Sequence, residues 1–395
     1  MRNKNVLLHL SLIPNVGPQT IINKILRGLF LQQFPNLLHA GLMEVIDAQN
    51  LLNLEILYSF SVNDFIRKCG LTERSALDVT NGLANRSLLA TEQDLIAQHS
   101  GTTVLSIFEP AYPEILKQIH MPPIVLYCKG TPLEAQAKRF SIVGSRKADA
   151  YASQVVSSVV PTMIAQGWHI VSGGAEGVDT MAHRATMVAG GRTLVVMGAG
   201  FLHTYPPSNK DFFKELEQNG GTLISPFSLN TPPDRSTFPA RNRIIAGLSQ
   251  GCLVVRAAAR SGALITAQFA IDQGRLIFAV PGSIYDDLSV GCHELIKQGA
   301  KLVNTVNDIL EDFNEFTPTS DVAPVTFAPA TREIQIQAKE KPYTNPLLHH
   351  LTSSCTIDEL SGKTGLSLDD LFDSLFALQL EGKVRQNFAG QWERV

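Results

Sequence analysis

Two arginines flank an asparagine in the stretch Phe238-Pro239-Ala240-Arg241-Asn242-Arg243, where an apolar helical pattern begins. Arginines are unusual at this position, because the positive end of the helix dipole favours acidic side chains. An anion held between the guanidinium groups and the free N–H groups of the first helical turn would stabilise the arrangement. Arg241 and Arg243 therefore predict a phosphate site. Phe238 beside them is either a platform on which a base stacks or a core residue behind the loop.

Basic side chains are concentrated around this stretch, although the chain of 395 residues has a formal net charge of −3. Between residues 235 and 275 the one acid is Asp272, whereas the arginines are Arg235, Arg241, Arg243, Arg256, Arg260 and Arg275. Guanidinium groups bind phosphates through paired hydrogen bonds, and the release of counterions adds affinity. Any binding of nucleic acid must therefore come from this local charge, since the whole chain offers no general attraction.

The elements that must position these side chains alternate between strand and helix patterns over residues 106–312. Apolar runs of strand length are found at Phe140–Val143, His169–Ser172, Thr193–Met197, Thr222–Ser225, Cys252–Val255, Leu276–Val280 and Lys301–Val303. Amphipathic segments of helical length separate most of them, which predicts an α/β fold with a mostly parallel sheet and helices on both faces. In such folds ligands bind beyond the carboxyl ends of the strands, where the strand order reverses.

Four loops that follow predicted strands contain unusual residues. The first two are Gly144–Lys147 and Ser172–Asp179. The third ends in Arg235-Ser236-Thr237 and leads into the stretch Phe238–Arg243, and the fourth is Arg256–Ala267. Glycines at such turns let backbone amides approach an oxyanion, and helix N-termini complete the cradle. One glycine loop is weak evidence, because glycine is common where strands turn into helices. Four loops at one sheet edge predict an anion-binding site.

The segments on either side of the sheet region differ from it. Residues 1–105 read as short helices, and Pro14–Pro18 resembles the turn of a SAM/helix-hairpin-helix-like module or of an ordinary helix pair. Prolines interrupt residues 313–342, which predicts a linker. Residues 343–395 show a helix, a glycine turn, a second helix and a hairpin, the pattern of a winged helix. The second helix carries acids and no basic residue, so we expect it to contact protein and not duplex DNA.

Several classes of function are disfavoured by the composition. The cysteines are far apart and never form a CxxC pair, which argues against a disulfide framework and a zinc site: Cys69, Cys128, Cys252, Cys292 and Cys355. The chain has no HExxH motif, no P-loop and no nucleophile beside an evident base, so we expect neither metal nor cofactor nor catalysis. It has no apolar run of membrane-spanning length and a polar N-terminus, which predicts a cytoplasmic protein without membrane contact.

The order of motifs resembles the DprA/Smf DNA-processing family across the whole sheet region. The matching segments are Pro122–Tyr127 with Lys129-Gly130, Val143–Arg146, Ser172–His183, Tyr205-Pro206, Phe238–Ile245, Ser261–Ala267 and Ala279–Gly282. The helical N-terminal region and the winged-helix pattern also resemble accessory domains of that family.

This resemblance implies an extended Rossmann-like domain that binds and protects single-stranded DNA and helps to load RecA during natural transformation. It also implies a homodimer formed through this domain. Carried onto the matching positions, the DNA-binding residues would be Gly144, Ser145, Arg146, Ser172, Gly173, Gly174, Arg235, Phe238, Arg241, Asn242, Arg243, Ser261 and Gly262.

Three positions depart from the family pattern. Pro226 and Arg256 stand where the family usually has acidic residues, and His293 replaces a common asparagine. Pro226 and Arg256 would make the edge more basic if they face the groove. Alternatively, they alter the geometry of the loops.

One enzymatic alternative remains open. The loop Ser172–Asp179 faintly resembles the PGGxGT loop of Rossmann-like nucleotide hydrolases of the lysine-decarboxylase-like type, in which Glu176 or Asp179 would act as acid or base. Asp179 also lies four residues before His183, so a hydrogen bond within one helix is its expected structural role. The abundance of arginine and the order of the motifs favour DNA binding over hydrolysis.

Overall fold

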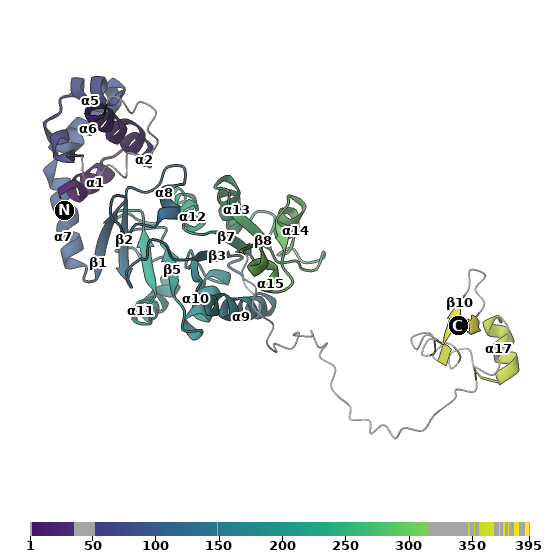
Figure 1. Cartoon of the computed structure of the whole chain (residues 1–395). Coiled ribbons are helices and arrows are strands. Elements are labelled where there is room, and N and C mark those ends of the chain that lie inside the picture. Colours follow the sequence, from purple (N-terminus) through teal and green to yellow (C-terminus); the bar gives the residue numbers. More distant parts are fainter. Residues whose placement is uncertain are drawn as a thin grey trace. The chain divides into compact units, whose positions relative to one another are not determined.

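The structure is a computed structural model, and it describes residues 2–34, 52–147 and 149–313 together with part of the C-terminal region. The described C-terminal residues are 347, 351, 355–366, 371, 374–375, 378, 383–386 and 392–394. The chain forms two compact units, Met1–Pro318 and Thr319–Val395 (Figure 1). The predicted linker lies outside the described residues except for Phe313, whose ring packs against Trp168 with centroids 4.7 Å apart.

A mixed, mostly parallel sheet forms the centre of the first unit, with the strand order β1-β2-β6-β5-β4-β3-β7-β8-β9 in the described residues. Its strands are β1 Thr102–Ser106, β2 Val125–Gly130, β3 Arg139–Val143, β4 His169–Ser172, β5 Thr193–Val196, β6 Thr222–Ser225, β7 Gly251–Val254, β8 Leu276–Ala279 and β9 Lys301–Leu302. The fold class is confirmed, and each predicted strand is present within one residue at either end. The sequence prediction missed β1 and β2, which pair antiparallel with each other, and β2 also pairs antiparallel with β6.

The strand order reverses at β3. From β3 the chain continues to β4, β5 and β6 on one side, and it then returns to place β7 on the other side of β3. Both neighbours are parallel to β3, so the carboxyl ends of β3, β4 and β7 lie at one edge. This reversal predicts a ligand crevice beyond β3 and β7, because the chain leaves these two strands in opposite directions.

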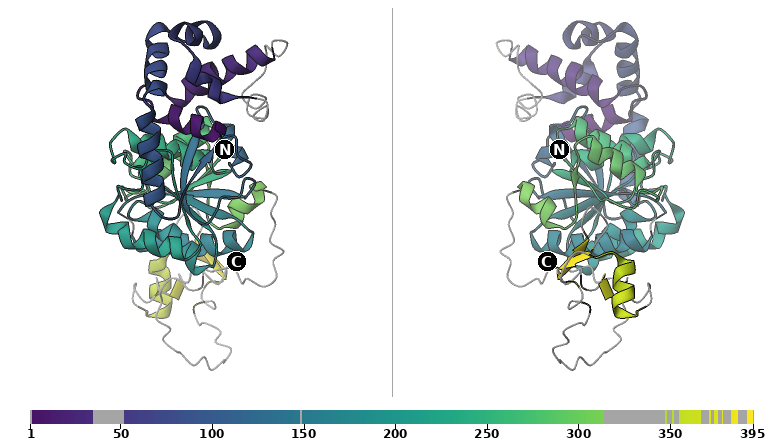
Figure 2. Two further views of the ribbon diagram at one scale, coloured as in Figure 1. Left: turned by 90° about the vertical axis from the view of Figure 1, so that its left-hand side faces the viewer. Right: turned by 90° about the vertical axis from the view of Figure 1, so that its right-hand side faces the viewer.

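Helices cover both faces of the sheet (Figure 2). Those in the sheet region are α8 Glu114–Lys117, α9 Ala150–Ala165, α10 Val178–Val188, η4 Pro207–Asn209, α11 Lys210–Gln218, α12 Thr237–Gly247, α13 Gly262–Asp272, α14 Val290–Lys297, α15 Asn307–Leu310 and η5 Glu311–Phe313. Phe140 and Ile142 of β3 share a buried cluster with Val156 and Val160 of α9. A second cluster, on α12, α13 and several strands, continues into the N-terminal helices. Among the described residues, no helix combines the length and apolar character needed to cross a bilayer.

The described residues that precede β1, 2–34 and 52–101, are mostly helical, in line with the predicted short helices. The elements are α1 Arg2–Leu12, α2 Pro18–Thr20, the π-helix η1 Ile21–Leu26, α3 Arg27–Gln33, η3 Leu54–Ser59, α5 Val62–Cys69, α6 Glu73–Ala84 and α7 Arg86–Gln98. The predicted glycine turn lies between α1 and α2, where Gly17 is the N-cap residue and Pro18 opens the helix. Ser61 and Asp64 form a reciprocal capping box that fixes the start of α5.

Helix α7 braces the sheet region from the N-terminal side. Glu92 of α7 is only 5% exposed, and its Oε1 accepts a hydrogen bond of 2.8 Å from the backbone N–H of Leu229, in the loop after β6. Leu229 in turn accepts a hydrogen bond from the N–H of Leu202 through its carbonyl oxygen. His99, at the end of α7, stacks on Phe201 of the same loop as Leu202, with ring centroids 6.4 Å apart. The helix therefore holds two loops of the sheet region together.

In the second unit, the described residues include a helix and a hairpin. Helix α17, Ile357–Thr364, begins with a capping box between Thr356 and Glu359. Strands β10 Val384–Gln386 and β11 Trp392–Arg394 pair antiparallel, and Leu371, Leu375 and Leu378 are buried with them in one cluster. The winged helix stays a prediction. The acids of its second helix lie outside the described residues.

The Glu92 brace can be tested by substitution. We expect Glu92→Ala to lower the free energy of unfolding by about 1–3 kcal/mol, because it leaves the buried N–H of Leu229 without an acceptor. Glu92→Gln keeps an oxygen acceptor and should recover most of the loss. Urea denaturation of the three proteins measures this. Equal stability of Glu92→Ala and the unsubstituted chain would contradict the brace.

Candidate nucleic-acid interface

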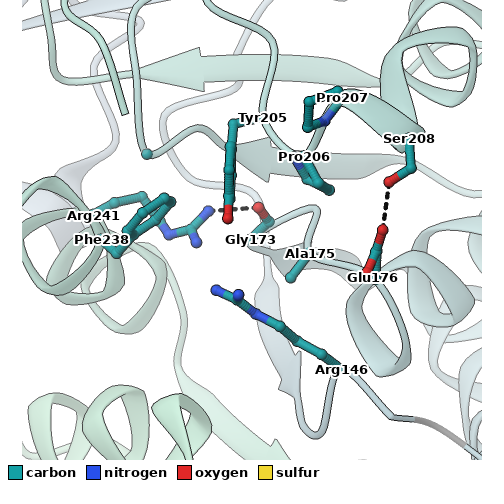
Figure 3. Close-up of a pocket in the computed structure, with 11 residues that line it drawn as sticks. Arg146, Gly173, Ala175, Glu176, Tyr205, Pro206, Pro207, Ser208, Phe238 and Arg241 are labelled. Atoms are coloured by element: carbon teal, nitrogen blue, oxygen red, sulfur yellow. Dashed lines mark hydrogen bonds between the residues drawn. The ribbon is translucent and has the colours of Figure 1, made fainter. Parts of the chain in front are cut away.

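Two adjoining hollows lie at the sheet edge where the strand order reverses. The narrow hollow, of about 330 Å³, is lined among others by Arg146, Gly173, Glu176, Tyr205, Ser208, Phe238 and Arg241 (Figure 3). The wide hollow, of about 590 Å³, is lined among others by Gly144–Lys147, Arg235, Asn242, Arg260, Ser261, Gly262 and Ile265. Both linings include Arg146, Ala175, Phe238 and Arg241, so the hollows adjoin, and together they are called the groove.

Most of the residues that the sequence predicted for the site line this groove. They are Gly144, Ser145, Arg146, Gly173, Arg235, Phe238, Arg241, Asn242, Ser261 and Gly262. They lie just after β3 and β4, on or just before α12, and at the start of α13, and the first and last of them, Gly144 and Gly262, are 118 residues apart in the chain. The structure therefore brings together loops that the sequence could only assign to the same edge.

Three predicted site residues lie behind the groove. Ser172 is fully buried and donates its hydroxyl to the Ile142 carbonyl at 2.6 Å. Gly174 has φ of +65° and packs so closely that a Cβ would approach the Val195 side chain to 2.7 Å. Arg243 points away, and its Nη1 donates to the carbonyl oxygens of His120 (2.9 Å) and Met121. None of the three is part of either lining.

Arg241 is a structural cation as well as a lining residue. The sequence predicted that Arg241 lies at the start of a helix. Helix α12 begins at Thr237, so Arg241 lies in its second turn. The side chain is buried, and its Nη1 donates to the carbonyl oxygens of Gly173 and Val196, at the ends of β4 and β5. Burial lowers the pKa of Arg241 to about 10, although Asp179 opposes the shift. Arg241 therefore ties α12 to the sheet edge.

The other arginines of the basic stretch divide between structure and surface. Arg256 pairs with Asp149 and Asp286 and donates to the Ser289 hydroxyl at 2.9 Å, and Arg275 donates to the Ile115 carbonyl at 3.0 Å. Only Arg235 and Arg260 of the stretch are both exposed and part of the wide hollow. The other four arginines of the stretch are bonded to carbonyl or carboxylate oxygens of the protein itself, so a joint action of all six on phosphates stays a prediction.

Four exposed cations nevertheless surround the wide hollow. Arg146 and Lys147 follow β3, whereas Arg235 precedes α12 and Arg260 precedes α13. The sequence prediction missed Lys147 and Arg260 as site residues. Lys147 lies in the loop that follows β3, and Arg260 lies just before α13 at the same edge of the sheet. These positions were the sequence signal by which both could have been assigned to the site.

The glycine loop after β4 is held from within. The Oδ2 atom of Asp179 accepts hydrogen bonds from the N–H groups of Gly173 (3.0 Å) and Ala175 (3.3 Å). These two amides are therefore occupied, contrary to the expectation that the loop offers them to phosphate. Gly177 has φ of +80°, and a Cβ there would come within 2.3 Å of the Ser145 carbonyl oxygen. Glycine is required at this contact between the β3 and β4 loops.

His183 does not bond to Asp179, which corrects the expected contact within the helix. Its Nδ1 lies 2.6 Å from the Thr193 hydroxyl on β5, and the ring is fully buried. Burial and, as the smaller cause, the Arg241 charge together lower the pKa of His183 to about 3. For Asp179, burial raises the carboxyl pKa, which Arg241 and the loop N–H groups counteract.

Phe238 is half-buried and faces both hollows. Its ring contacts Tyr205 with centroids 5.1 Å apart and an interplanar angle of 49°. A Cβ at Gly198 would come within 2.7 Å of the Phe238 ring, so this glycine makes room for it. Of the two alternatives for Phe238, an accessible platform fits its position better than a core residue. Tyr205 is a second aromatic wall to which the sequence assigned no role.

Arg256 and His293, two of the three positions that depart from the family pattern, have structural partners. Arg256 is buried against Asp149 and Asp286 and does not line the groove, so it does not make the edge more basic. Asp149 is also the N-cap residue of α9, which links this ion pair to the start of that helix. His293 lies with Nε2 3.1 Å from the Gly282 carbonyl oxygen.

The buried His183 predicts a dependence of stability on pH. The folded pKa of about 3 lies below the ordinary value of 6.5, so protonation favours the unfolded chain. The contribution of neutral His183 is present above pH 6.5 and is lost as the pH falls toward 3. Between pH 7 and 5.5 we expect the unsubstituted chain to lose about 1 kcal/mol more stability than His183→Gln. Urea titrations at the two pH values measure this. Parallel losses in both proteins would contradict it.

Comparison with known proteins places the chain in a family. The family model of DNA recombination-mediator protein A matches residues 103–314, which contain the sheet and the groove. The DNA processing protein DprA of Bacillus subtilis is 42% identical over 219 residues, which cover 55% of this chain and 73% of that protein. Protein Smf of Escherichia coli is 35% identical over 263 residues, or 66% of this chain and 69% of that protein.

A solved structure is similar beyond the sheet region. The X-ray structure of DprA from Streptococcus pneumoniae matches with a TM-score of 0.62 and 30% identity, covering 79% of this chain and 99% of that one. The resemblance that the motifs indicated is therefore confirmed over the sheet that carries the groove. The chain belongs to the DNA recombination-mediator protein A family of DNA-processing proteins.

Proposed function

We propose that the chain binds single-stranded DNA in the groove at the carboxyl edge of its sheet. The observation that carries this proposal is the grouping of exposed Arg146, Lys147, Arg235 and Arg260 around a hollow with an aromatic wall. Cations that track a backbone, beside aromatic faces on which bases stack, are the usual means of binding single strands. The family's description as a recombination mediator and its relatives' names as DNA-processing proteins support the same function.

In this proposal, different parts of a DNA strand bind in the two hollows of the groove. Phosphates would lie along the wide hollow, where the exposed cations are. A base would enter the narrow hollow and stack on Phe238 or Tyr205, which requires a base that is not already paired within a duplex. In this proposal Arg241 shapes the groove through its bonds to backbone carbonyls, and it does not clamp a phosphate.

The family's description as a recombination mediator supports a biological role as part of this proposal. A recombination mediator that holds a single strand protects it and presents it to a recombinase, here RecA, during natural transformation or recombination. The nucleotide-hydrolase alternative needs Glu176 or Asp179 as acid or base. Asp179 is buried and already accepts two backbone N–H groups, so only Glu176 is exposed for that chemistry.

We also infer a homodimer formed through the far edge of the sheet. Strand β9 ends the sheet in the described residues. Apolar side chains are exposed on the last two strands, with Leu276 on β8 40% exposed and Leu302 on β9 38% exposed. A second copy would cover this apolar edge, which water otherwise contacts.

The strand-binding proposal is tested with fluorescent oligo-dT across a salt series. We expect tight, salt-dependent binding, with the slope of log K against log salt reduced by about 0.7 in Arg146→Ala or Arg260→Ala, since each loses one phosphate contact. Arg184→Ala on α10, an exposed arginine paired with Glu215 outside both linings, is the matched control and should keep the slope.

Arg243→Ala distinguishes two hypotheses: that Arg243 only bonds to backbone carbonyls, as in the structure, and that it binds a phosphate, as the sequence predicted. We expect its slope to match the unsubstituted chain. Unchanged slopes in Arg146→Ala and Arg260→Ala would show that the strand binds at another part of the surface. Absence of binding by the unsubstituted chain would remove the proposal, and turnover of nucleoside monophosphates that disappears in Glu176→Gln would then favour the hydrolase.

The dimer is tested by light scattering. Leu302→Lys places a charge at the apolar edge and should convert a dimer into a monomer, because burying an unpaired charge costs more than the apolar contact supplies. Val188→Lys, at a position 90% exposed at the end of α10, is the control and should remain dimeric. A dimer that persists in Leu302→Lys would exclude this edge.

A further inference from the structure

The groove contains an exposed carboxylate, that of Glu176, which a site that binds only phosphates does not explain. Among the described lining residues only Glu176 and Asp179 carry carboxylates, and Asp179 is buried and bonded to the loop amides. Glu176 is exposed and lines the narrow hollow but not the wide one. A phosphate beside this like charge would be repelled. The group that meets Glu176 must therefore be a hydrogen-bond donor.

The Glu176 carboxylate is held in place before any ligand binds. Its Oε1 accepts a hydrogen bond from the Ser208 hydroxyl. The next residue, Asn209, donates to the Gly174 carbonyl at 3.0 Å and to the Thr180 hydroxyl at 2.9 Å. The segment with Ser208 is thus fixed to the loop with Glu176, and little conformational freedom would be lost on binding.

The two ends of the narrow hollow differ in chemistry. In Figure 3 the Arg146 side chain extends toward Phe238 and Arg241, whereas Glu176 lies beside Ser208 at the other end. A planar ligand stacked on the aromatic wall would therefore meet a guanidinium donor on one side and a carboxylate acceptor on another. The volume of about 330 Å³ is within the range of pockets that enclose small organic groups.

We propose that the narrow hollow selects guanine, a specificity that rests on the proposed binding of single-stranded DNA. Guanine presents two adjacent donors, N1–H and the N2 amino group, that match the two oxygens of Glu176. Its O6 and N7 acceptors match the paired donors of Arg146. Adenine and cytosine present one amino donor next to a ring acceptor. Thymine presents one N–H between two carbonyl groups, whose lone pairs would face the carboxylate.

The test compares oligo-dT strands that carry one central guanine, inosine or adenine with plain oligo-dT, by fluorescence anisotropy at fixed salt. We expect the guanine strand to bind at least about fivefold more tightly than oligo-dT, the lower bound for a good bidentate base contact. Inosine lacks the N2 amino group and should lose part of this preference. Glu176→Gln should abolish it, whereas Glu215→Gln on α11 should leave it intact.

The outcomes separate this inference from the function on which it rests. Equal binding of all strands with a normal salt slope would overturn guanine selection and leave the groove as a general strand-binding site. A gain in affinity of Glu176→Gln for every strand alike would also overturn it, because Glu176 would then only repel phosphate. Loss of binding to all strands by the unsubstituted chain would overturn the proposed function itself.

A second probe identifies the source of the guanine. Guanosine monophosphate that displaces the guanine strand, where thymidine monophosphate does not, would support a pocket open to free nucleotides as well as to strands. A preference for the guanine strand that persists without displacement by guanosine monophosphate would support reading of guanine within a strand only.

Discussion

The groove depends on one buried guanidinium. Arg241 joins α12 to the carbonyl oxygens of Gly173 and Val196, at the carboxyl ends of β4 and β5. The Asp179 carboxylate accepts hydrogen bonds from amides of the same loop after β4. Its negative charge also opposes the lowering of the Arg241 pKa that burial causes. Because a buried cation must have its donors satisfied, these contacts leave little freedom in where α12 lies. Phe238, one turn earlier on α12, takes its position over the groove from this arrangement.

The cations of the sheet edge therefore have two separate tasks. Arg241, Arg243, Arg256 and Arg275 lie against backbone carbonyls or carboxylates and join elements that are distant in the chain. The exposed cations around the wide hollow have their charge open to solvent. Of these described cations, the second group has the exposure needed to exchange water and counterions for phosphates, an exchange that supplies much of the affinity of nucleic-acid-binding proteins in general. Local density of arginine is thus a poor measure of a phosphate site.

The N-terminal helices contribute to the same edge from outside it. Through Glu92 and His99, α7 contacts the loops that contain Leu229 and Phe201. The second of these loops leads to Tyr205, which forms the aromatic wall with Phe238. A structural connection therefore runs from the helical region to the narrow hollow, and the groove of the sheet is not independent of the residues that precede it.

The sequence by itself determined the parallel core of the fold. Buried parallel strands read as continuous apolar runs, so β3 to β9 could be predicted within one residue at either end. Strand β1 was missed because it lies at the sheet margin with alternating burial and has no continuous buried apolar run. Strand β2 does have such a run, Val125–Cys128, and the sequence contained the signal that would have identified it. The motifs also predicted that the loops of the groove share one edge, since parallel strands bring their carboxyl ends together.

Only the tertiary structure decided what each side chain does there. Arg241 and Arg260 belong to the same basic stretch of sequence, but Arg241 is 6% exposed and bonded to carbonyl oxygens, whereas Arg260 is exposed at the wide hollow. The difference arises because α12 begins at Thr237, which turns Arg241 toward the sheet. Tyr205 and Glu176 likewise gained their places in the narrow hollow from contacts with Phe238 and Ser208, which are distant in the chain. Burial and partners depend on packing between distant segments, and local sequence patterns do not contain that information.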